Sequence, residues 1–255
     1  MCGRYKRKAD KQRIAEEFHV KHSVAGVSMP PEDLNVTLYS TQPVIRDNRD
    51  DGDRELVMMR WGLVPFHTKD IDKLKGRNMF NARAEGIATT ASWREPFKKR
   101  RCLVPASAFY EWDKIGNAQG GPFTLTRSDA SMFAFAGIWD AWKDTRGDWL
   151  QSFAIVTTEP NELLARIHPR MPVILHQQDY DRWLSRDESE RPPLDVLRPY
   201  EAEGMDMTPG GPPCRKRVAK ARWLSILRHQ FCRVWTASSR GQARAATAAG
   251  RSQAR

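Results

Sequence analysis

Cys2, the second residue of the chain, could do covalent chemistry through both its side chain and its main chain. Initiator methionine is commonly removed when the next residue is small, and its removal would leave an α-amine and a thiol on one carbon. With reference pKa values of roughly 8 and 8.5, both groups have a usable nucleophilic form near neutral pH. With an aldehyde, the amine can form a Schiff base, and the thiol can then close a five-membered thiazolidine. The alternative is an ordinary cysteine behind a retained methionine.

A second group of polar side chains alternates along a strand predicted over Asn78–Glu85. Asn81, Arg83 and Glu85 would share one face of this strand, with small alanines opposite. An amide, a guanidinium and a carboxylate in a row suit a phosphate and a polar reaction centre. A solvated strand face would show the same pattern.

Glu111 is a single carboxylate within an aromatic, apolar run, Phe109-Tyr110-Glu111-Trp112. If this side chain is buried, desolvation would raise the pKa of its carboxyl group, which suits general acid–base catalysis. The alternative is a glutamate on an edge strand that points to water.

His168 stands before Pro169, so it should leave the preceding helix in an extended conformation. Its place near the carbonyl end of that helix favours the protonated imidazole. Arg170 follows on the same side. The sequence therefore offers a proton donor beside a cation.

Trp61 and Gly62 form a further candidate element. A tryptophan beside a glycine can stack on a nucleic-acid base while the backbone approaches the strand closely. Packing of Trp61 in the protein core is the equally weighted alternative.

The elements that would position these residues are mostly short strands. We predict a strand at Leu56–Trp61 and further strands at Asn78–Glu85, Cys102–Trp112, Phe123–Thr126, Met132–Trp139 and Phe153–Thr157. Amphipathic helices are expected at Asp10–Phe18, Glu159–Ile167 and Asp179–Arg186. The polar stretch Ser40–Asp53 should include a loop or a hairpin tip. This pattern favours an α+β or barrel-like single domain over a doubly wound sheet.

The net charge of +11 is unevenly distributed. Residues 205–255 contain 11 Lys and Arg and one acidic residue, whereas residues 1–204 contain 31 basic and 30 acidic residues. Any nucleic-acid groove in the folded part must therefore come from local clustering. No apolar stretch approaches the roughly 18 residues of a membrane span, and the charged start is typical of neither a secretory signal nor a lipoprotein leader, so a cytoplasmic protein is expected. The four scattered cysteines predict neither a zinc site nor a disulfide scaffold.

Taken in order, several motifs resemble the SOS response-associated peptidase (SRAP) family. They are Met-Cys-Gly-Arg-Tyr at the start, Trp61-Gly62-Leu63-Val64-Pro65, Asn81-Ala82-Arg83-Ala84-Glu85, Cys102-Leu103-Val104-Pro105 with Phe109-Tyr110-Glu111-Trp112, Phe135-Ala136-Gly137-Ile138-Trp139, Phe153-Ala154-Ile155-Val156-Thr157-Thr158 and His168-Pro169-Arg170-Met171-Pro172. The resemblance covers about residues 2–204, and we expect residues 205–255 to be a basic, low-complexity tail that is disordered or divergent.

The resemblance implies a compact α+β domain around a mainly antiparallel, barrel-like sheet with short flanking helices. It also implies covalent capture of abasic sites in single-stranded DNA, without a cofactor or metal, by a monomer. Catalytic roles would fall to Cys2 as nucleophile, Asn81 as positioning residue, Glu111 as proton shuttle and His168 as the acid for sugar ring opening. DNA contacts would come from Arg4, Trp61, Gly62, Arg83 and Arg170. The family name adds a peptidase-like activity, which would include removal of Met1.

Two other functions fit parts of this pattern. Cys2 could be the nucleophile of an N-terminal-nucleophile hydrolase that cleaves peptides or amides without DNA. Alternatively, the basic tail and Trp61 could bind single-stranded DNA without catalysis, and in that protein the loss of Cys2 would leave DNA association unchanged.

Overall fold

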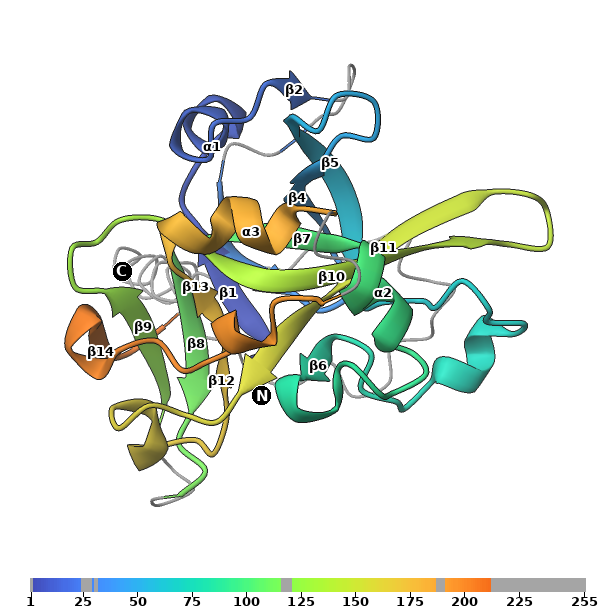
Figure 1. The fold of residues 1–255 in the computed structure, drawn as a ribbon. Coiled ribbons are helices and arrows are strands. Elements are labelled where there is room, and N and C mark those ends of the chain that lie inside the picture. The colour runs from blue at the N-terminus through green and yellow to red at the C-terminus, as the bar shows by residue number, and fades with distance from the viewer. Residues whose placement is uncertain (1, 24–28, 30–31, 116–120, 187–190, 212–255) are drawn as a thin grey trace, which may run out of the picture. The chain divides into compact units, whose positions relative to one another are not determined.

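The computed structural model describes residues 2–23, 29, 32–115, 121–186 and 191–211 (Figure 1). They belong to one compact unit, Met1–Arg215. A second unit, Lys216–Arg255, lies outside the described residues, as does the greater part of the predicted tail. Among the described residues, no helix is both long and apolar enough to cross a membrane.

Five strands close into a small barrel. Their order is β5, β4, β7, β10 and β11, each antiparallel to the next, and β11 then pairs in parallel with β5 through Ser152↔Arg60 and Phe153↔Trp61. The strands are β4 (Thr41–Asp47), β5 (Arg54–Trp61), β7 (Arg101–Ala106), β10 (Phe133–Lys143) and β11 (Trp149–Thr158). In Figure 1 the β10–β11 hairpin projects beyond its neighbouring strands. The predicted barrel-like, mainly antiparallel α+β fold is confirmed.

A second, fully antiparallel sheet has the order β14-β9-β8-β1-β3. Its strands are β1 (Arg4–Arg7), β3 (Asp33–Thr37), β8 (Ala108–Trp112), β9 (Pro122–Arg127) and β14 (Met205–Pro209). β14 begins at the first residue of the predicted tail, so the sheet extends to at least Pro209. β14 pairs along its whole length with residues 123–127 of β9, so the two strands satisfy each other's backbone polar groups.

Short elements complete the fold. The helices are α1 (Lys11–Glu17), α2 (Arg94–Lys99) and α3 (Tyr180–Leu184), and the remaining strands are β2 (His22–Ser23), β6 (Asn81–Arg83), β12 (Met171–Pro172) and β13 (Ile174–Leu175). Helix α1 starts where the sequence indicates, because the Asp10 carboxylate accepts a hydrogen bond from the Arg13 N–H at 2.9 Å. Ile14 and Phe18 are buried on one face of this helical segment. The three predicted segments around Asp10, Leu56 and Asp179 are thus confirmed.

Two predicted strands differ from the structure. Cys102–Trp112 is not one strand but two, because the chain crosses at Ser107 from β7 in the barrel to β8 in the second sheet. The Ser107 N–H donates to the Lys6 carbonyl at 2.7 Å at this crossing. Asn78–Glu85 is shortened to β6, since the chain turns into a 3₁₀ helix at Ala84–Gly86. Sequence alternation therefore identified the strands but not where they end.

Two other predictions also need correction. The segment Ser40–Asp53 contains strand β4 as well as the expected hairpin tip, which occupies the residues between Asp47 and Arg54. The predicted helix Glu159–Ile167 is a single 3₁₀ turn at Leu164–Arg166. The Asn161 side chain accepts a hydrogen bond from the Leu164 N–H at 2.9 Å, and side-chain bonds of this kind compete with a regular helix.

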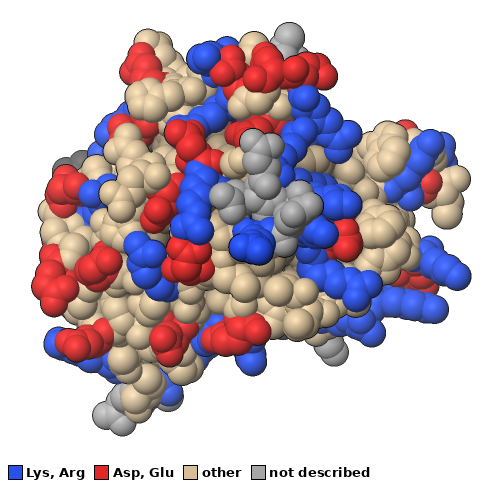
Figure 2. Space-filling model, in the orientation of Figure 1, with Lys and Arg blue, Asp and Glu red and all other residues tan. Residues whose placement is uncertain are grey.

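Charged side chains of both signs are mixed over much of the surface seen in Figure 2, although Lys and Arg gather toward one side. This mixture agrees with the near balance of 31 basic and 30 acidic residues in residues 1–204. Within residues 1–204, attraction of a polyanion would therefore rely on particular cations rather than on net charge.

Candidate active site

The four predicted catalytic residues come from four separate segments that meet near one end of the barrel. β6 and β12 both pair with the carboxyl end of β11, which brings Asn81 opposite Ile155 and Pro172 opposite Thr157. In the second sheet Tyr5 lies opposite Phe109. Because β1 and β8 are antiparallel, this register carries Cys2 toward Glu111.

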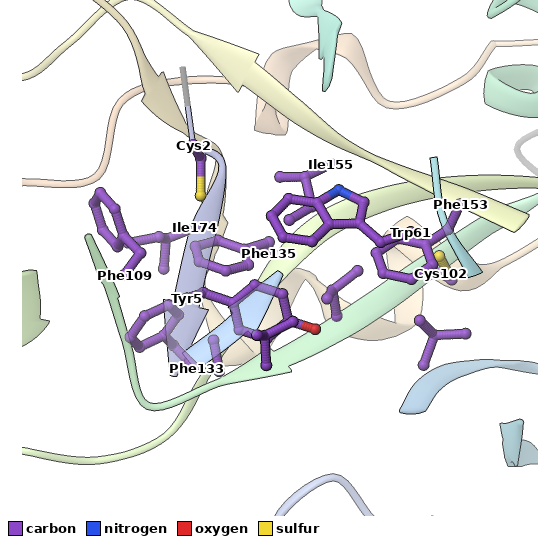
Figure 3. Packing of buried hydrophobic residues seen from close by; sticks show 14 of the residues in the cluster. Cys2, Tyr5, Trp61, Cys102, Phe109, Phe133, Phe135, Phe153, Ile155 and Ile174 are labelled. Atoms are coloured by element: carbon purple, nitrogen blue, oxygen red, sulfur yellow. The ribbon is translucent and has the colours of Figure 1, made fainter. Parts of the chain in front are cut away.

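Cys2 is completely buried, and its sulfur points into the hydrophobic cluster that includes Phe109, Phe135 and Ile174 (Figure 3). Burial raises the pKa of the Cys2 thiol well above its usual range, and the negative charge of Glu111 raises it further. The thiol is therefore protonated at neutral pH. A base must remove its proton when it acts as a nucleophile.

Asn81 is 3% exposed and holds the backbone of Cys2 directly. Its Nδ2 donates a hydrogen bond of 2.9 Å to the Cys2 carbonyl oxygen. The other end of the amide, Oδ1, is buried and has no hydrogen-bond partner among the described residues. A buried acceptor without a donor is costly, so this atom is suited to receive a donor from a ligand or from a free amine at Cys2.

Glu111 is 2% exposed, and burial raises the pKa of its carboxyl group. Of the two sequence alternatives, the buried glutamate with a raised pKa describes this structure. One carboxylate oxygen, Oε2, lies 3.8 Å from Nε2 of His168. The two groups are thus neighbours within the site without forming a close hydrogen bond.

His168 differs from the prediction in its charge. Burial lowers the pKa of its imidazole to about 4, and the positive charge at the amino terminus of the chain adds to the effect, as do Lys114 and Arg170. Hydrogen bonding to the Arg170 backbone acts in the opposite direction. The ring is therefore neutral at pH 7. The expected stabilisation of the imidazolium by a helix end is absent because the preceding turn is a single 3₁₀ turn.

The sequence did not single out Lys114, which the structure brings to the site. Its Nζ lies 2.9 Å from Nε2 of His168, and its backbone N–H donates to the Ile167 carbonyl at 2.8 Å. Nothing in the sequence pattern marks Lys114 as a site residue, because its contact with His168 joins residues that are far apart in the sequence.

The three candidate phosphate-binding arginines differ in availability. Arg83 is exposed, and Arg4 is half-buried and donates to Asn35 Oδ1 at 2.9 Å. Arg170 makes a forked ion pair with Glu85, and its Nη2 also donates to the Thr157 carbonyl at 2.6 Å. A phosphate at Arg170 would therefore have to displace Glu85.

Trp61 lies in the core rather than on the surface, so the second of the two sequence alternatives describes this structure. It is 0% exposed, stacks on Phe153 with ring centroids 6.3 Å apart, and donates from its indole N–H to the Phe80 carbonyl at 2.9 Å. The neighbouring Gly62 has φ +127°, and a Cβ there would lie 2.9 Å from the Tyr39 ring. This pair therefore has a structural role in shaping the barrel.

One group of described residues has the right atoms to hold a cation. The ligand atoms of His22, Asp51 and Asp53 lie within 4.8 Å of one another on the surface. His22 Nε2 is 2.8 Å from Asp51, and Lys21 Nζ is 2.8 Å from Asp53, so basic side chains already contact both carboxylates. This group shares no residue with the site around Cys2.

Comparison with known proteins identifies the family of this chain. The family model described as SOS response associated peptidase (SRAP) matches residues 1–216. The chain is 33% identical over 207 residues to the abasic site processing protein YoqW of Bacillus subtilis, covering 81% of this chain and 90% of the relative. A crystal structure of a Bacteroides thetaiotaomicron protein superposes with a TM-score of 0.71 at 29% identity, covering 81% of this chain and 90% of that one. A crystal structure of a Bordetella bronchiseptica protein superposes with a TM-score of 0.69 at 26% identity, covering 82% of this chain and 99% of that one. The chain therefore belongs to the SRAP family.

Proposed function

We propose that this protein processes abasic sites in single-stranded DNA by forming a covalent thiazolidine with Cys2. The observation that carries the proposal is the surroundings of Cys2: a buried thiol whose backbone is held by Asn81, with Glu111 and His168 nearby. The relatives named as abasic site processing proteins support the choice of substrate.

The reaction begins after removal of Met1. The open form of the abasic sugar carries an aldehyde at C1′, which the Cys2 amine attacks to give a Schiff base with loss of water. The thiol then adds to the C=N carbon, and its proton passes to the nitrogen. Because burial and Glu111 hold the thiol neutral, the amine is the first nucleophile and the sulfur the second.

Asn81 and Glu111 have distinct tasks in this scheme. Asn81 fixes the Cys2 carbonyl, and its Oδ1 would accept a hydrogen bond from the amine or from the thiazolidine N–H. Glu111, with its raised pKa, would take the thiol proton and return it to the nitrogen. Glu111 and His168 together would transfer protons among the sugar oxygens. Arg4, Arg83 and Arg170 are the candidate phosphate ligands, and phosphate contacts of this kind position a strand without reading its sequence.

A denaturing gel tests this proposal. Purified protein with Met1 removed, as verified by mass spectrometry, is mixed with single-stranded DNA that carries one abasic site. We expect a heat-stable shifted band that Cys2→Ser abolishes. The mass of the adduct should equal protein plus DNA minus one water, since thiazolidine closure after Schiff-base formation loses no further atoms.

Cys102→Ala is the matched control, because Cys102 is equally buried but has no polar catalytic neighbour in the proposed scheme. It should leave the band intact. If folded, Met-processed protein gives no band, the proposed function is wrong. If protein that retains Met1 captures the DNA, the two-nucleophile mechanism is wrong.

Asn81→Ala separates positioning from nucleophilicity. Without the amide, Cys2 keeps both nucleophiles but loses the contact that holds its carbonyl. We expect the crosslinking rate to fall by about 10-fold or more, in line with the loss of one buried hydrogen bond of about 1.5 kcal/mol. An unchanged rate in single-turnover measurements would remove Asn81 from the mechanism.

A further inference from the structure

The contact between Lys114 and His168 fixes where the imidazole carries its proton. Lysine ammonium has three donors and no acceptor, so the nitrogen that faces it at 2.9 Å, Nε2, must be the acceptor. A neutral ring then carries its proton on Nδ1. That atom lies 2.8 Å from the Arg170 carbonyl oxygen, which accepts it.

The opposite tautomer fits the contacts less well. It would place a proton on Nε2, between the Lys114 ammonium at 2.9 Å and the Glu111 carboxylate at 3.8 Å. Nδ1 would then accept from the Arg170 N–H at 3.0 Å. Each tautomer sets one pair of donors against each other: Nδ1–H faces the Arg170 N–H at 3.0 Å, and Nε2–H faces the ammonium at 2.9 Å. The Nδ1–H form satisfies two of the three contacts, with Lys114 and with the Arg170 carbonyl, whereas the Nε2–H form satisfies only the one from the Arg170 N–H. The lysine therefore decides against the histidine–glutamate hydrogen bond that the two side chains would otherwise form.

The backbone holds Lys114 in place for this contact. Its N–H is bonded to the carbonyl of Ile167, the residue before His168, at 2.8 Å. Side chain and main chain thus join the end of β8 to the His168 turn at two adjacent residues.

We propose that Lys114 is a positioning residue that holds His168 in its Nδ1–H form, which makes Nε2 the basic nitrogen of the ring. The role of this device in catalysis rests on the proposed function, whereas the tautomer itself does not. Lys114 thereby gives His168 the part of a base where the sequence had indicated an acid.

Sugar ring opening then balances around His168. Nε2 releases the Lys114 hydrogen bond and takes the proton of the C1′ hydroxyl as the C1′=O bond forms and the C1′–O4′ bond breaks. The electron pair goes to O4′, which takes this proton from the imidazolium, and the neutral Nδ1–H ring is restored.

Nitrogen-15 NMR of the histidine rings in the full chain tests the tautomer without DNA. We compare wild type, Lys114→Met and Lys114→Arg, and assign His168 from the signal lost in His168→Gln. Wild type should show the proton on Nδ1 at pH 7. Lys114→Met should move it to Nε2 and raise the pKa of His168, since a neighbouring cation has been removed; Glu111 would then favour the imidazolium, while Arg170 and the amino terminus still oppose it. Lys114→Arg should resemble wild type.

The pH dependence of crosslinking tests whether the contact between Lys114 and His168 matters for catalysis. In Lys114→Met, the acidic limb of the pH–rate profile should move to higher pH, because His168 becomes protonated at a higher pH. Lys114→Arg should keep the acidic limb of wild type. Thermal unfolding controls for folding, and the exposed position of Lys114 predicts little change. A wild-type ring protonated at Nε2, or a tautomer and pKa unaffected by Lys114→Met, would overturn the inference. Failure of every variant, wild type included, to crosslink DNA would count against the proposed function alone.

Discussion

Two fully buried cysteines mark two contrasting regions of one core. We call the surroundings of Cys2 the polar end (Cys2, Asn81, Glu111 and His168) and those of Cys102 the apolar centre (Trp61, Cys102 and Phe153). Figure 3 shows the two sulfurs at opposite sides of the hydrophobic cluster. Burial raises the thiol pKa at both, so neither is a thiolate by default.

The difference lies in what surrounds each sulfur. Cys102 packs so tightly against Gly137 that a Cβ there would lie 2.7 Å from the sulfur. Cys2 has a buried amide, a buried carboxyl and a buried imidazole near it. A buried cysteine is therefore a candidate nucleophile because of its polar neighbours. Burial alone does not distinguish a nucleophilic cysteine from one that only packs in the core.

After the loss of Cys2 itself, the largest expected effect is at Glu111 in the polar end. Glu111→Gln keeps the shape of the side chain but removes its titration, so the crosslinking rate should fall by about 10²- to 10⁴-fold, the usual contribution of a general acid–base group. Single-turnover rates on abasic single-stranded DNA measure this loss. The melting temperature should not fall, because a buried carboxyl with a raised pKa gains little from being charged. A rate within twofold of wild type would place Glu111 outside the chemistry.

Next in size is Trp61→Ala in the apolar centre. Removing a fully buried indole should cost about 3–5 kcal/mol in the free energy of unfolding. Urea denaturation measures this loss. The crosslinking rate per folded molecule and the affinity for DNA should be unchanged under conditions where the variant is folded. A selective loss of DNA affinity with normal stability would instead support base stacking by Trp61.

A smaller effect is expected at the neighbouring Gly62. Gly62→Ala places a side chain on a backbone with φ +127° and drives its Cβ toward the Tyr39 ring. Strain of this kind costs about 1–3 kcal/mol. Denaturant unfolding should show it, and Gly52→Ala is the control for positive φ in open space, since nothing lies within 4 Å of a Cβ there. Equal losses at both positions would show that the Tyr39 contact adds nothing.

The smallest effect separates the two cysteines themselves. Cys102→Ala should reduce the free energy of unfolding by about 1 kcal/mol, as is typical of a modest core truncation. The same substitution at Cys2 should abolish crosslinking. Comparing thermal unfolding with gel shifts for both variants sharpens the contrast. Loss of the crosslink in a stably folded Cys102→Ala protein would contradict the contrast between the two cysteines.

Alternation and turn residues located most of the secondary structure from sequence. The Asp10 cap and the apolar alternation of Leu56–Trp61 and Phe153–Thr157 are local signals, and the structure confirms these elements. The ends of elements were less certain. The break at Ser107 depends on which sheet the chain joins next, and the short turn at Leu164–Arg166 accompanies a hydrogen bond from the Leu164 N–H to the Asn161 side chain.

The candidate site shows the same division. Residue types and motif order identified Cys2, Asn81, Glu111 and His168, because nucleophiles, amides and titratable groups are recognisable one by one. The charge of His168 and the presence of Lys114 were not recognisable, since both follow from desolvation and from contacts across 54 residues of sequence. Trp61 was ambiguous for a similar reason, because an indole can stack on a nucleic-acid base or pack in a protein core.

The sequence by itself determined which reactive groups are present, the strand-rich class of the fold and the family to which the chain belongs. These properties depend on residue type and on local periodicity. Tertiary structure decided which groups meet, how deeply they are buried and which nitrogen of His168 carries a proton. Those properties arise from pairings such as Tyr5↔Phe109 and Ile155↔Asn81, which join distant segments. They also arise from the removal of water, which shifts every titratable group at the polar end.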